Sequence, residues 1–386
     1  MLYLSKMNRF LLISIVILTT AFQTQAQSEV DSLMKLHQYD LAIDELEGAV
    51  SLDIQGQQKL AEAYLKSGRL YRALDSYKKL YKADSNNSHL LQQAIILEKL
   101  DEESEALKVY VKLNGLAPNN AYYWKLTAKS ALKNSEYPLS LAAWNAVLER
   151  SPNDLEAINK MALLYNKLDQ AELADSLLKE GLKLSPESRF LKSSRLKVLY
   201  RQRKYAEAVK ISEELFAQAD SNLVHQKVAG ISNYHIENYQ KTIDLLSNVI
   251  EVETESDLLH YYIGLAYRDS GDKEKAAEYL EKAIELGVTK NLGNYYTQLA
   301  VSYEEAGETA KAIQAYKVAY SESKDKVLLY HLARNYDSYY KDKKVALSYY
   351  EKYLQEKDTA NEYLMNYSKH RIQELKNAAH FENGSF

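Results

Sequence analysis

The chain has 386 residues, a formal charge of −4 from 49 Lys plus Arg and 53 Asp plus Glu, and no cysteine. The slight negative charge argues against nucleic-acid binding over the whole surface, because such binding needs many phosphate-neutralising cations. The absence of cysteine excludes disulfides, thiolate zinc sites and a cysteine nucleophile. Apolar residues make up 46 %, which excludes global disorder, and 12 Gly with 4 Pro are too few for a turn-rich β fold. The composition therefore favours helices joined by short turns.

The N-terminus has the layout of a secretory signal peptide. Lys6 and Arg9 precede an uncharged stretch over 10–22, and the small residue Ala26 follows shortly before Gln27. The 13 uncharged residues are too few to span a hydrocarbon layer of about 30 Å comfortably. We predict that 1–26 is removed and that the mature chain is exported, to the periplasm or beyond the cell. The alternative is an uncleaved anchor in the inner membrane.

A repeat of about 34 residues organises the rest of the chain. One small residue recurs at spacings of 31 to 36 residues, at Ala42, Ala73, Ala106, Ser140, Ala174, Ala208, Thr242, Ala276, Ala312 and Ala346. A second small residue stands twelve positions before most of these, as at Ala61, Ala94, Ala128, Ala162, Gly230, Gly264 and Ala300. A large apolar residue follows four positions after most of them, as at Tyr77, Tyr110, Trp144, Leu178, Leu246, Leu280, Tyr316 and Tyr350.

Each period predicts two helices. Apolar and small residues fall on one helical face over 258–270, Gly271 ends that helix, and a second apolar face runs over 275–286. Small residues at both crossing points let two helices approach closely, while the large residue fills the adjoining hole. Three turns between repeats begin with proline and continue with residues suited to cap the next helix. The capping candidates are Asn120, Asp154 and Ser188.

This pattern resembles the tetratricopeptide repeat family. It is clearest in Ile263-Gly264-x-x-Tyr267 followed by Ala276, Leu280 and Ala283, and it covers about ten units over 29–360. The resemblance implies an all-α solenoid, an α-α superhelix of helix-turn-helix repeats. The predicted segments are a signal peptide (1–26), the repeat array (27–360), a capping helix (361–376) and a disordered tail (377–386). In the capping helix, the residues expected to face inward are Tyr363, Leu364, Tyr367, Ile372 and Leu375.

Two repeats depart from the pattern. The 189–222 repeat has Leu196 at the small position and Ser212 at the large one, which predicts the weakest packing of the array. The last repeat has Arg334 at its small position with Ala333 beside it, which predicts one extra residue in its turn.

The sequence offers little sign of catalysis. It contains no His-Glu-x-x-His, no phosphate-binding Gly-Lys loop and no Gly-x-Ser-x-Gly elbow. The eight histidines are scattered, so we predict no metal site, no cofactor and no enzymatic activity. A hydrolase or transferase with a site built across the groove is the rival from another class.

The family resemblance implies that the first helix of each pair lines a concave groove in which a peptide lies. Residues 121–204 hold 15 Lys plus Arg against 9 Asp plus Glu, and basic residues fall on the expected groove face. The candidate binding residues are Lys125, Lys129, Lys133, Lys160, Lys167, Lys197 and Arg201.

Lys125, Lys129 and Lys133 are like charges one helical turn apart, which costs a few tenths of a kcal/mol per pair. If no structural contact offsets this repulsion, the lysines are expected to bind a ligand. The predicted ligand is anionic: an acidic peptide segment, a chain terminus or an anionic glycan. The alternative is a solvated lysine face.

Tyrosine is the second feature, with 18 of the 33 tyrosines in 257–386. One helix cannot bury both members of an adjacent pair equally, so some hydroxyls should face water or a partner. These doublets are Tyr261 with Tyr262, Tyr295 with Tyr296, and Tyr339 with Tyr340.

The sequence thus predicts a non-enzymatic scaffold that binds a protein or peptide, with no nucleic-acid or metal partner. A structural subunit of a cell-envelope or secretion complex is the alternative, and membrane association would come only through partners or an uncleaved N-terminus.

Overall fold

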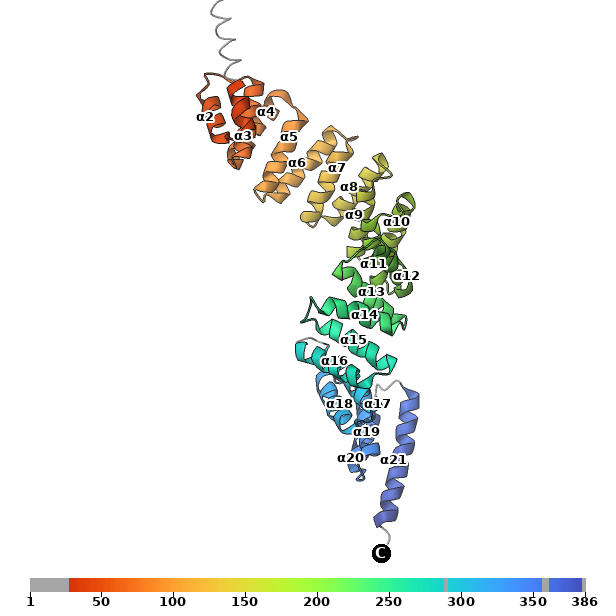
Figure 1. Cartoon of the computed structure of the whole chain (residues 1–386). Helices are drawn as coiled ribbons and strands as arrows, with labels where there is room; N and C mark the ends of the chain where they lie inside the picture. Colours follow the sequence, from red (N-terminus) through yellow and green to blue (C-terminus); the bar gives the residue numbers. More distant parts are fainter. Residues whose placement is uncertain (1–27, 288–290, 356–360, 384–386) are drawn as a thin grey trace, which may run out of the picture. The chain divides into compact units, whose positions relative to one another are not determined.

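The computed structural model describes residues 28–287, 291–355 and 361–383, and the side chains of this part up to 378. These residues form helices joined by short turns, with no strand among them, as Figure 1 shows, so the predicted all-α class is confirmed. The chain packs as two units that divide after Leu184.

The first unit holds a helix over 28–35, followed by α2 (Tyr39–Gly48), α3 (Ile54–Lys66), α4 (Leu70–Asp84), α5 (Asn87–Lys99), α6 (Glu103–Leu116), α7 (Ala121–Lys133), α8 (Tyr137–Arg150), α9 (Leu155–Lys167) and α10 (Ala171–Leu184).

The second unit holds α11 (Arg189–Arg201), α12 (Tyr205–Ala217), α13 (Leu223–His235), α14 (Tyr239–Ile250), α15 (Asp257–Ser270), α16 (Lys273–Leu286), α17 (Leu292–Glu305), α18 (Thr309–Ser323), α19 (Val327–Tyr339), α20 (Lys344–Gln355) and α21 (Glu362–Asn383).

Within each unit the helices form consecutive pairs. In the second unit α11 packs on α12, α13 on α14, α15 on α16, α17 on α18 and α19 on α20. The first helices of successive pairs also touch, as α11 touches α13, α13 touches α15 and α15 touches α17. This is the contact pattern of a helical repeat array, in which each pair buries its open apolar face against its neighbours.

The small residues lie where the two helices of a pair cross. All ten recurring small residues of the second helices, from Ala42 to Ala346, are fully buried. The approach is close in α15, where a Cβ atom added to Gly264 would lie 2.8 Å from Cγ of Leu280 and 3.2 Å from the backbone oxygen of Ala276. The predicted pairing of a small residue with a large one is therefore confirmed in this pair.

The turn inside nearly every pair passes through the left-handed backbone region. Gly271 has φ of 103° there, a conformation that costs glycine little because it has no Cβ. Gly68 and Gly307 occupy the same place with φ of 81° and 78°, as the repeat predicts. Other pairs place ordinary residues there, for example Asp101 and Asp169, at some cost in backbone strain.

The predicted N-caps hold in two of three cases. The side chain of Asn120 accepts a hydrogen bond from the backbone N–H of Tyr122 at 3.0 Å, and Asp154 accepts one from Ala157 at 3.0 Å. Ser188 was expected to cap α11 in the same way, but its side chain makes no capping hydrogen bond. This expectation was wrong because a suitable residue type does not fix the side-chain rotamer.

The 189–222 repeat departs from the packing rule in a compensated way. Leu196 on α11 is fully buried, and Ser212 on α12 is 1 % exposed, with its hydroxyl donating to the backbone oxygen of Val209 at 2.7 Å. Compared with the other pairs, the large residue, Leu196, stands on the first helix and the small residue, Ser212, on the second. The pair therefore keeps its summed side-chain volume.

The last pair carries the predicted extra turn residue. Ala333 is fully buried on α19, whereas its neighbour Arg334 is exposed. Residues 340–343 separate α19 from α20, one residue more than the three that separate α17 from α18. The register predicted from Ala333 and Ala346 is therefore confirmed.

The terminal helix α21 differs from its prediction in length and orientation. It runs to Asn383 instead of ending at 376, so the boundary drawn for a tail at 377 was wrong, and 384–386 lie outside the described residues. Leu375 is buried, and Leu364 and Ile372 pack against the core of the last pair, as predicted. Tyr367 is 40 % exposed, and its ring also meets the buried rings of Tyr330 and Tyr350. Tyr363 is 73 % exposed, so the inward orientation expected for it was wrong.

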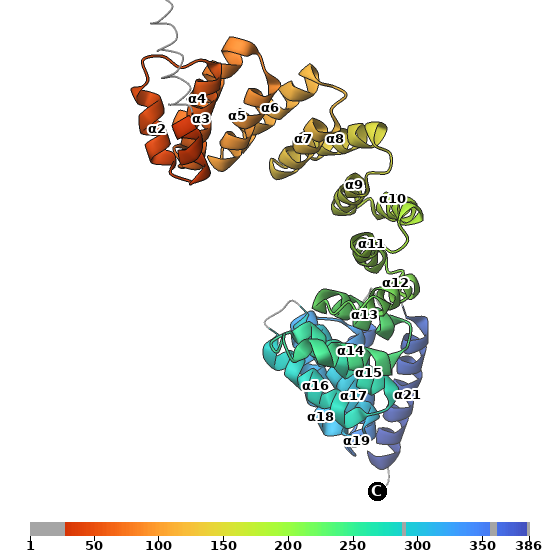
Figure 2. The same cartoon turned by 45° about the horizontal axis from the view of Figure 1, so that its top comes forward.

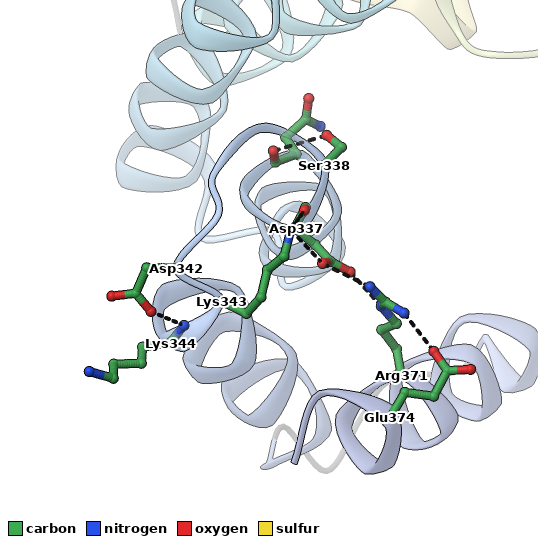
Figure 3. Close-up of polar contacts among 8 residues, drawn as sticks. Asp337, Ser338, Asp342, Lys343, Lys344, Arg371 and Glu374 are labelled. Atoms are coloured by element: carbon green, nitrogen blue, oxygen red, sulfur yellow. Dashed lines mark hydrogen bonds and ion pairs between the residues drawn. The ribbon is translucent and has the colours of Figure 1, made fainter. Parts of the chain in front are cut away.

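An ion-pair network attaches α21 to α19 (Figure 3). The Arg371 guanidinium donates to both carboxylate oxygens of Asp337, at 2.6 and 3.1 Å, and a further donation reaches Glu374 at 2.6 Å. The side chain of Asp337 is only 9 % exposed, and Lys343 approaches it from the turn before α20. A buried carboxylate is stable only when it is paired, so this network fixes where α21 docks.

Replacing Arg371 with alanine should loosen α21 selectively. The change removes the two-point contact and leaves Asp337 with Lys343 as its remaining cation, which should cost about 1–3 kcal/mol. Hydrogen exchange in α21 should accelerate at least about five-fold. Lys369→Ala on an exposed face of the same helix is the matched control and should leave exchange unchanged. Equal exchange in the two variants would show that the network does not hold the helix.

The predicted signal peptide, 1–26, lies outside the described residues. Among the residues that are described, the model contains no helix with the length and apolar character needed to cross a membrane.

Candidate functional site

In each unit the candidate site is the face formed by the first helices of that unit's pairs, called here the first-helix face of the unit. The basic residues predicted for it fall in both units. Lys125, Lys129, Lys133, Lys160 and Lys167 lie on α7 and α9 of the first unit, whereas Lys197 and Arg201 lie on α11 of the second.

The three lysines of α7 are paired with carboxylates of neighbouring helices. Lys125 Nζ lies 2.5 Å from Asp154 and 3.1 Å from Glu156, at the start of α9. Lys129 Nζ lies 2.8 Å from Glu156. Lys133 Nζ lies 3.1 Å from Glu103, at the start of α6.

These ion pairs give the three lysines a structural role, because they link α7 to the starts of α6 and α9. Sequence analysis did not predict this role. Burial lowers the pKa of Lys125, but its bonds to Asp154 and Glu156 outweigh this and raise the pKa. Lys129 in turn lowers the pKa of Glu156. The inference that the like charges lack a structural role was therefore wrong, because it considered α7 alone. The prediction that the row binds an anion is a separate statement and stays a prediction.

The other four candidates are exposed. Lys160 forms no ion pair among the described residues, and Lys167 Nζ lies 4.6 Å from the ring centre of Tyr137. Lys197 is exposed in the middle of α11 and Arg201 at its end. The solvent-exposed charges of the first-helix face in the first unit are therefore Lys160 and Lys167, together with Lys129 and Lys133, whose side chains are 49 % and 55 % exposed despite their ion pairs.

The second unit carries a continuous row of aromatic rings, called here the aromatic row, on and beside its first helices. Its members come from α11 to α17, which follow one another in Figure 2. They are Tyr200, Tyr205, Tyr234, His235, Tyr239, Tyr261, Tyr262 and Tyr295.

The rings touch in sequence across four pairs. His235 stacks on Tyr205 with ring centres 4.0 Å apart and meets Tyr262 edge-on at 5.9 Å. Tyr262 meets Tyr261 at 5.5 Å, and Tyr261 stacks on Tyr295 at 4.6 Å. His235 is exposed, Tyr205, Tyr261 and Tyr262 are half-buried, and Tyr295 is buried. The row therefore leaves several rings partly accessible to solvent above a packed base.

The hydroxyl groups of the row are held in place. Tyr234 donates to Asp269 at 2.9 Å and Tyr295 donates to Asp257 at 3.2 Å, while Tyr261 accepts from Asn294 at 2.9 Å. Burial raises the pKa of Tyr234, and it raises that of Tyr295 to about 12. These phenols stay neutral near pH 7 and therefore keep their hydrogen-bonding O–H groups.

Sequence analysis found part of this row. The doublet argument was confirmed for Tyr295 of the row, which is buried, and its neighbour Tyr296, which is half-buried, and outside the row for Tyr339 and Tyr340, which are 53 % and 43 % exposed. Tyr261 and Tyr262 are both half-buried. The doublet argument missed the contributions of α11 to α14. A signal was present, because Tyr200 and Tyr234 stand 34 residues apart, as do Tyr205 and Tyr239. Aromatic residues at one repeat position fall on one face of the array.

One hydrogen-bonded chain in the second unit has the residue types of a hydrolase. His225 Nδ1 lies 2.5 Å from Asp220, and its Nε2 lies 2.7 Å from Ser193 Oγ. A similar pair recurs in the first unit, where His89 Nε2 lies 3.0 Å from Asp84.

Both histidines are buried near the start of a first helix, five residues after the aspartate that precedes it. Ser193 lies beyond the first turn of α11, where backbone N–H groups are used within the helix and offer no oxyanion hole. The recurrence therefore favours a structural bond between successive elements.

No three His, Asp or Glu residues of the described chain converge closely enough to hold a metal ion.

Comparison with known proteins identifies the repeat. Residues 258–287 and 296–323 match two family models of the tetratricopeptide repeat. Among solved structures, a tetratricopeptide repeat protein from Parabacteroides merdae has a TM-score of 0.45 and 17 % identity, covering 64 % of this chain and 98 % of that one. MamA from Desulfovibrio magneticus has a TM-score of 0.41 and 20 % identity, covering 43 % and 94 %.

YrrB, described as a tetratricopeptide repeat protein with an unusual peptide-binding site, has a TM-score of 0.44 and 16 % identity, covering 50 % and 98 %. The matched segments of this chain cover nearly all of α15 with α16, and most of α17 with all of α18, which are two pairs of the second unit. The chain is thus an all-α repeat protein that carries tetratricopeptide repeats in these pairs.

Proposed function

We propose that this protein is a non-enzymatic scaffold that binds an extended segment of a partner protein on the first-helix face of its second unit. The observation that supports this most directly is the aromatic row. Half-buried rings on a rigid helical base provide contact area at a small cost in side-chain entropy, and fixed hydroxyls provide orientation.

The test is site-specific photo-crosslinking in the full chain. Benzoylphenylalanine replaces Tyr205 in one variant and Tyr340 in another, and each is irradiated in extract of the source cells. Crosslinks from position 205 to one defined protein support the proposal. Crosslinks from position 340 alone contradict it.

The exposure of Tyr339 and Tyr340 supports a second candidate function. These two rings lie at the end of α19, outside the aromatic row, and meet edge-on with centres 4.8 Å apart. Exposed aromatic pairs of this kind suit a fixed protein–protein contact. The chain would then be a structural subunit of an envelope or secretion complex, and crosslinks from position 340 alone would identify it.

The lysine row of the first unit is proposed as a separate site for an anionic group. Changing Lys125, Lys129 and Lys133 together to glutamine should weaken binding of an acidic partner and flatten its salt dependence. The same change leaves Glu156 and Glu103 without these cations, so it should also lower stability by about 1 kcal/mol in total. Fluorescence titration of the unchanged chain and the variant against a glutamate-rich peptide, at two salt concentrations, measures the affinity and its salt dependence for each. An unchanged affinity and slope would assign the row to structure alone.

We further propose that the chain is exported after removal of 1–26. The layout of Lys6, Arg9 and Ala26 supports this. Mass spectrometry of the protein from fractionated cells should find a mature N-terminus near Gln27, and an intact N-terminus in the membrane fraction would contradict it.

A further inference from the structure

One repeat position near the end of each first helix in the second unit holds a base in the earlier repeats and a carboxylate in the later ones. The last turns of these helices place Arg201, His235, Asp269 and Glu305 at spacings of 34, 34 and 36 residues. Cations are favourable at a helix C-terminus and carboxylates are unfavourable, by about 0.3–1 kcal/mol each. The ends of α15 and α17 therefore keep carboxylates at positions where the helix itself favours the opposite charge.

Asp269 contacts the aromatic row directly, and Glu305 is linked to it through Arg268. Asp269 accepts from the Tyr234 hydroxyl at 2.9 Å and from Arg268 Nε at 2.7 Å. Glu305 forms an ion pair with Lys273, and its negative charge also helps to raise the pKa of Arg268. The side chains of Asp269 and Glu305 remain 24 % and 41 % exposed. Each can therefore accept a further hydrogen bond from solvent or from a ligand.

The surroundings of the row are acidic overall. Residues 200–305, which hold the whole row with Asp269 and Glu305, contain 11 Lys plus Arg and 18 Asp plus Glu, a balance of −7. The cations Arg201, Arg203 and Lys204 lie beside Tyr200 and Tyr205 at one end of this stretch, and the carboxylates prevail over the rest of it. A field of this sign attracts a cationic segment and repels an acidic one.

We propose that the aromatic row, with Asp269 and Glu305 at its edge, binds an extended polypeptide segment rich in arginine or lysine. This inference rests on the proposed scaffold function and names the partner chemistry. A guanidinium stacks on tyrosine faces and is attracted by the ring quadrupole, while its N–H groups donate to carboxylates. The row supplies half-buried tyrosine faces, and its acidic edge supplies the acceptors.

The experiment uses the full chain and two labelled twelve-residue probes, one alternating arginine with glycine and one alternating glutamate with glycine. Fluorescence anisotropy at 50 and 300 mM salt should show binding of the arginine probe that weakens at least about ten-fold with salt. The glutamate probe should not compete for the same site. Binding of both probes with equal affinity, or of neither, overturns the inference.

Two matched pairs of variants locate the site. Tyr205→Leu with Tyr262→Leu keeps apolar volume but removes two ring faces, and it should weaken the arginine probe about ten-fold. Tyr339→Leu with Tyr340→Leu removes an exposed pair outside the row and should change nothing. Asp269→Asn with Glu305→Gln should weaken the probe and reduce its salt slope.

Glu274→Gln with Glu278→Gln, on exposed positions of α16, is the charge control. Thermal melting confirms that each variant folds. Equal effects in the row variants and their controls contradict the inference.

The outcome is separable from that of the proposed function. If crosslinking from position 205 captures a partner whose captured segment is neutral or acidic, the scaffold function stands and this inference falls. If position 205 captures nothing, both fall.

Discussion

Replacing Ala276 with arginine is expected to lower the free energy of unfolding of the second unit by about 4 kcal/mol or more. Ala276 is fully buried at the crossing of α15 and α16, and its backbone oxygen would lie 3.2 Å from a Cβ atom added to Gly264. An arginine there must either bury an unpaired charge or force the helices apart, and both are costly. Thermal and urea unfolding of the full chain measure the loss.

Glu278→Arg provides the matched control, because it introduces the same residue two positions along α16 at an exposed site. Surface changes of this kind usually cost under about 0.5 kcal/mol. Similar unfolding midpoints for the two variants would refute the register that places Ala276 at the crossing.

The second large effect is expected from the exchanged residues of α11 and α12. Leu196→Ala removes most of a fully buried side chain and should cost about 2–5 kcal/mol. Ser212→Leu adds volume to a site that is 1 % exposed, and by overpacking it should cost about 1–3 kcal/mol.

The double variant, Leu196→Ala with Ser212→Leu, restores the arrangement that the neighbouring pairs use. In those pairs a small residue on the first helix faces a large one sixteen positions later, as Gly230 faces Leu246. The double-mutant cycle should therefore give a favourable coupling of about 1–3 kcal/mol. Strictly additive losses would show that Leu196 and Ser212 do not share one space.

The sequence by itself determined the repeated elements of this protein. The 34-residue spacing of small residues predicts paired helices, and the same positions from Ala42 to Ala346 are fully buried. It also predicted the turn at Gly271 and the extra residue before α20. Such features are local or recur at a fixed period, so one-dimensional information is enough to place them.

Tertiary structure decided what the side chains on the first-helix face contact. The pairing of Lys125 with Asp154 joins α7 to the start of α9, and no rule of spacing within one helix reveals it. The stacking of Tyr205 on His235 likewise depends on how α12 lies against α13. Contacts between repeats depend on the rotation from one pair to the next, which small differences in packing set and which the repeat period does not encode.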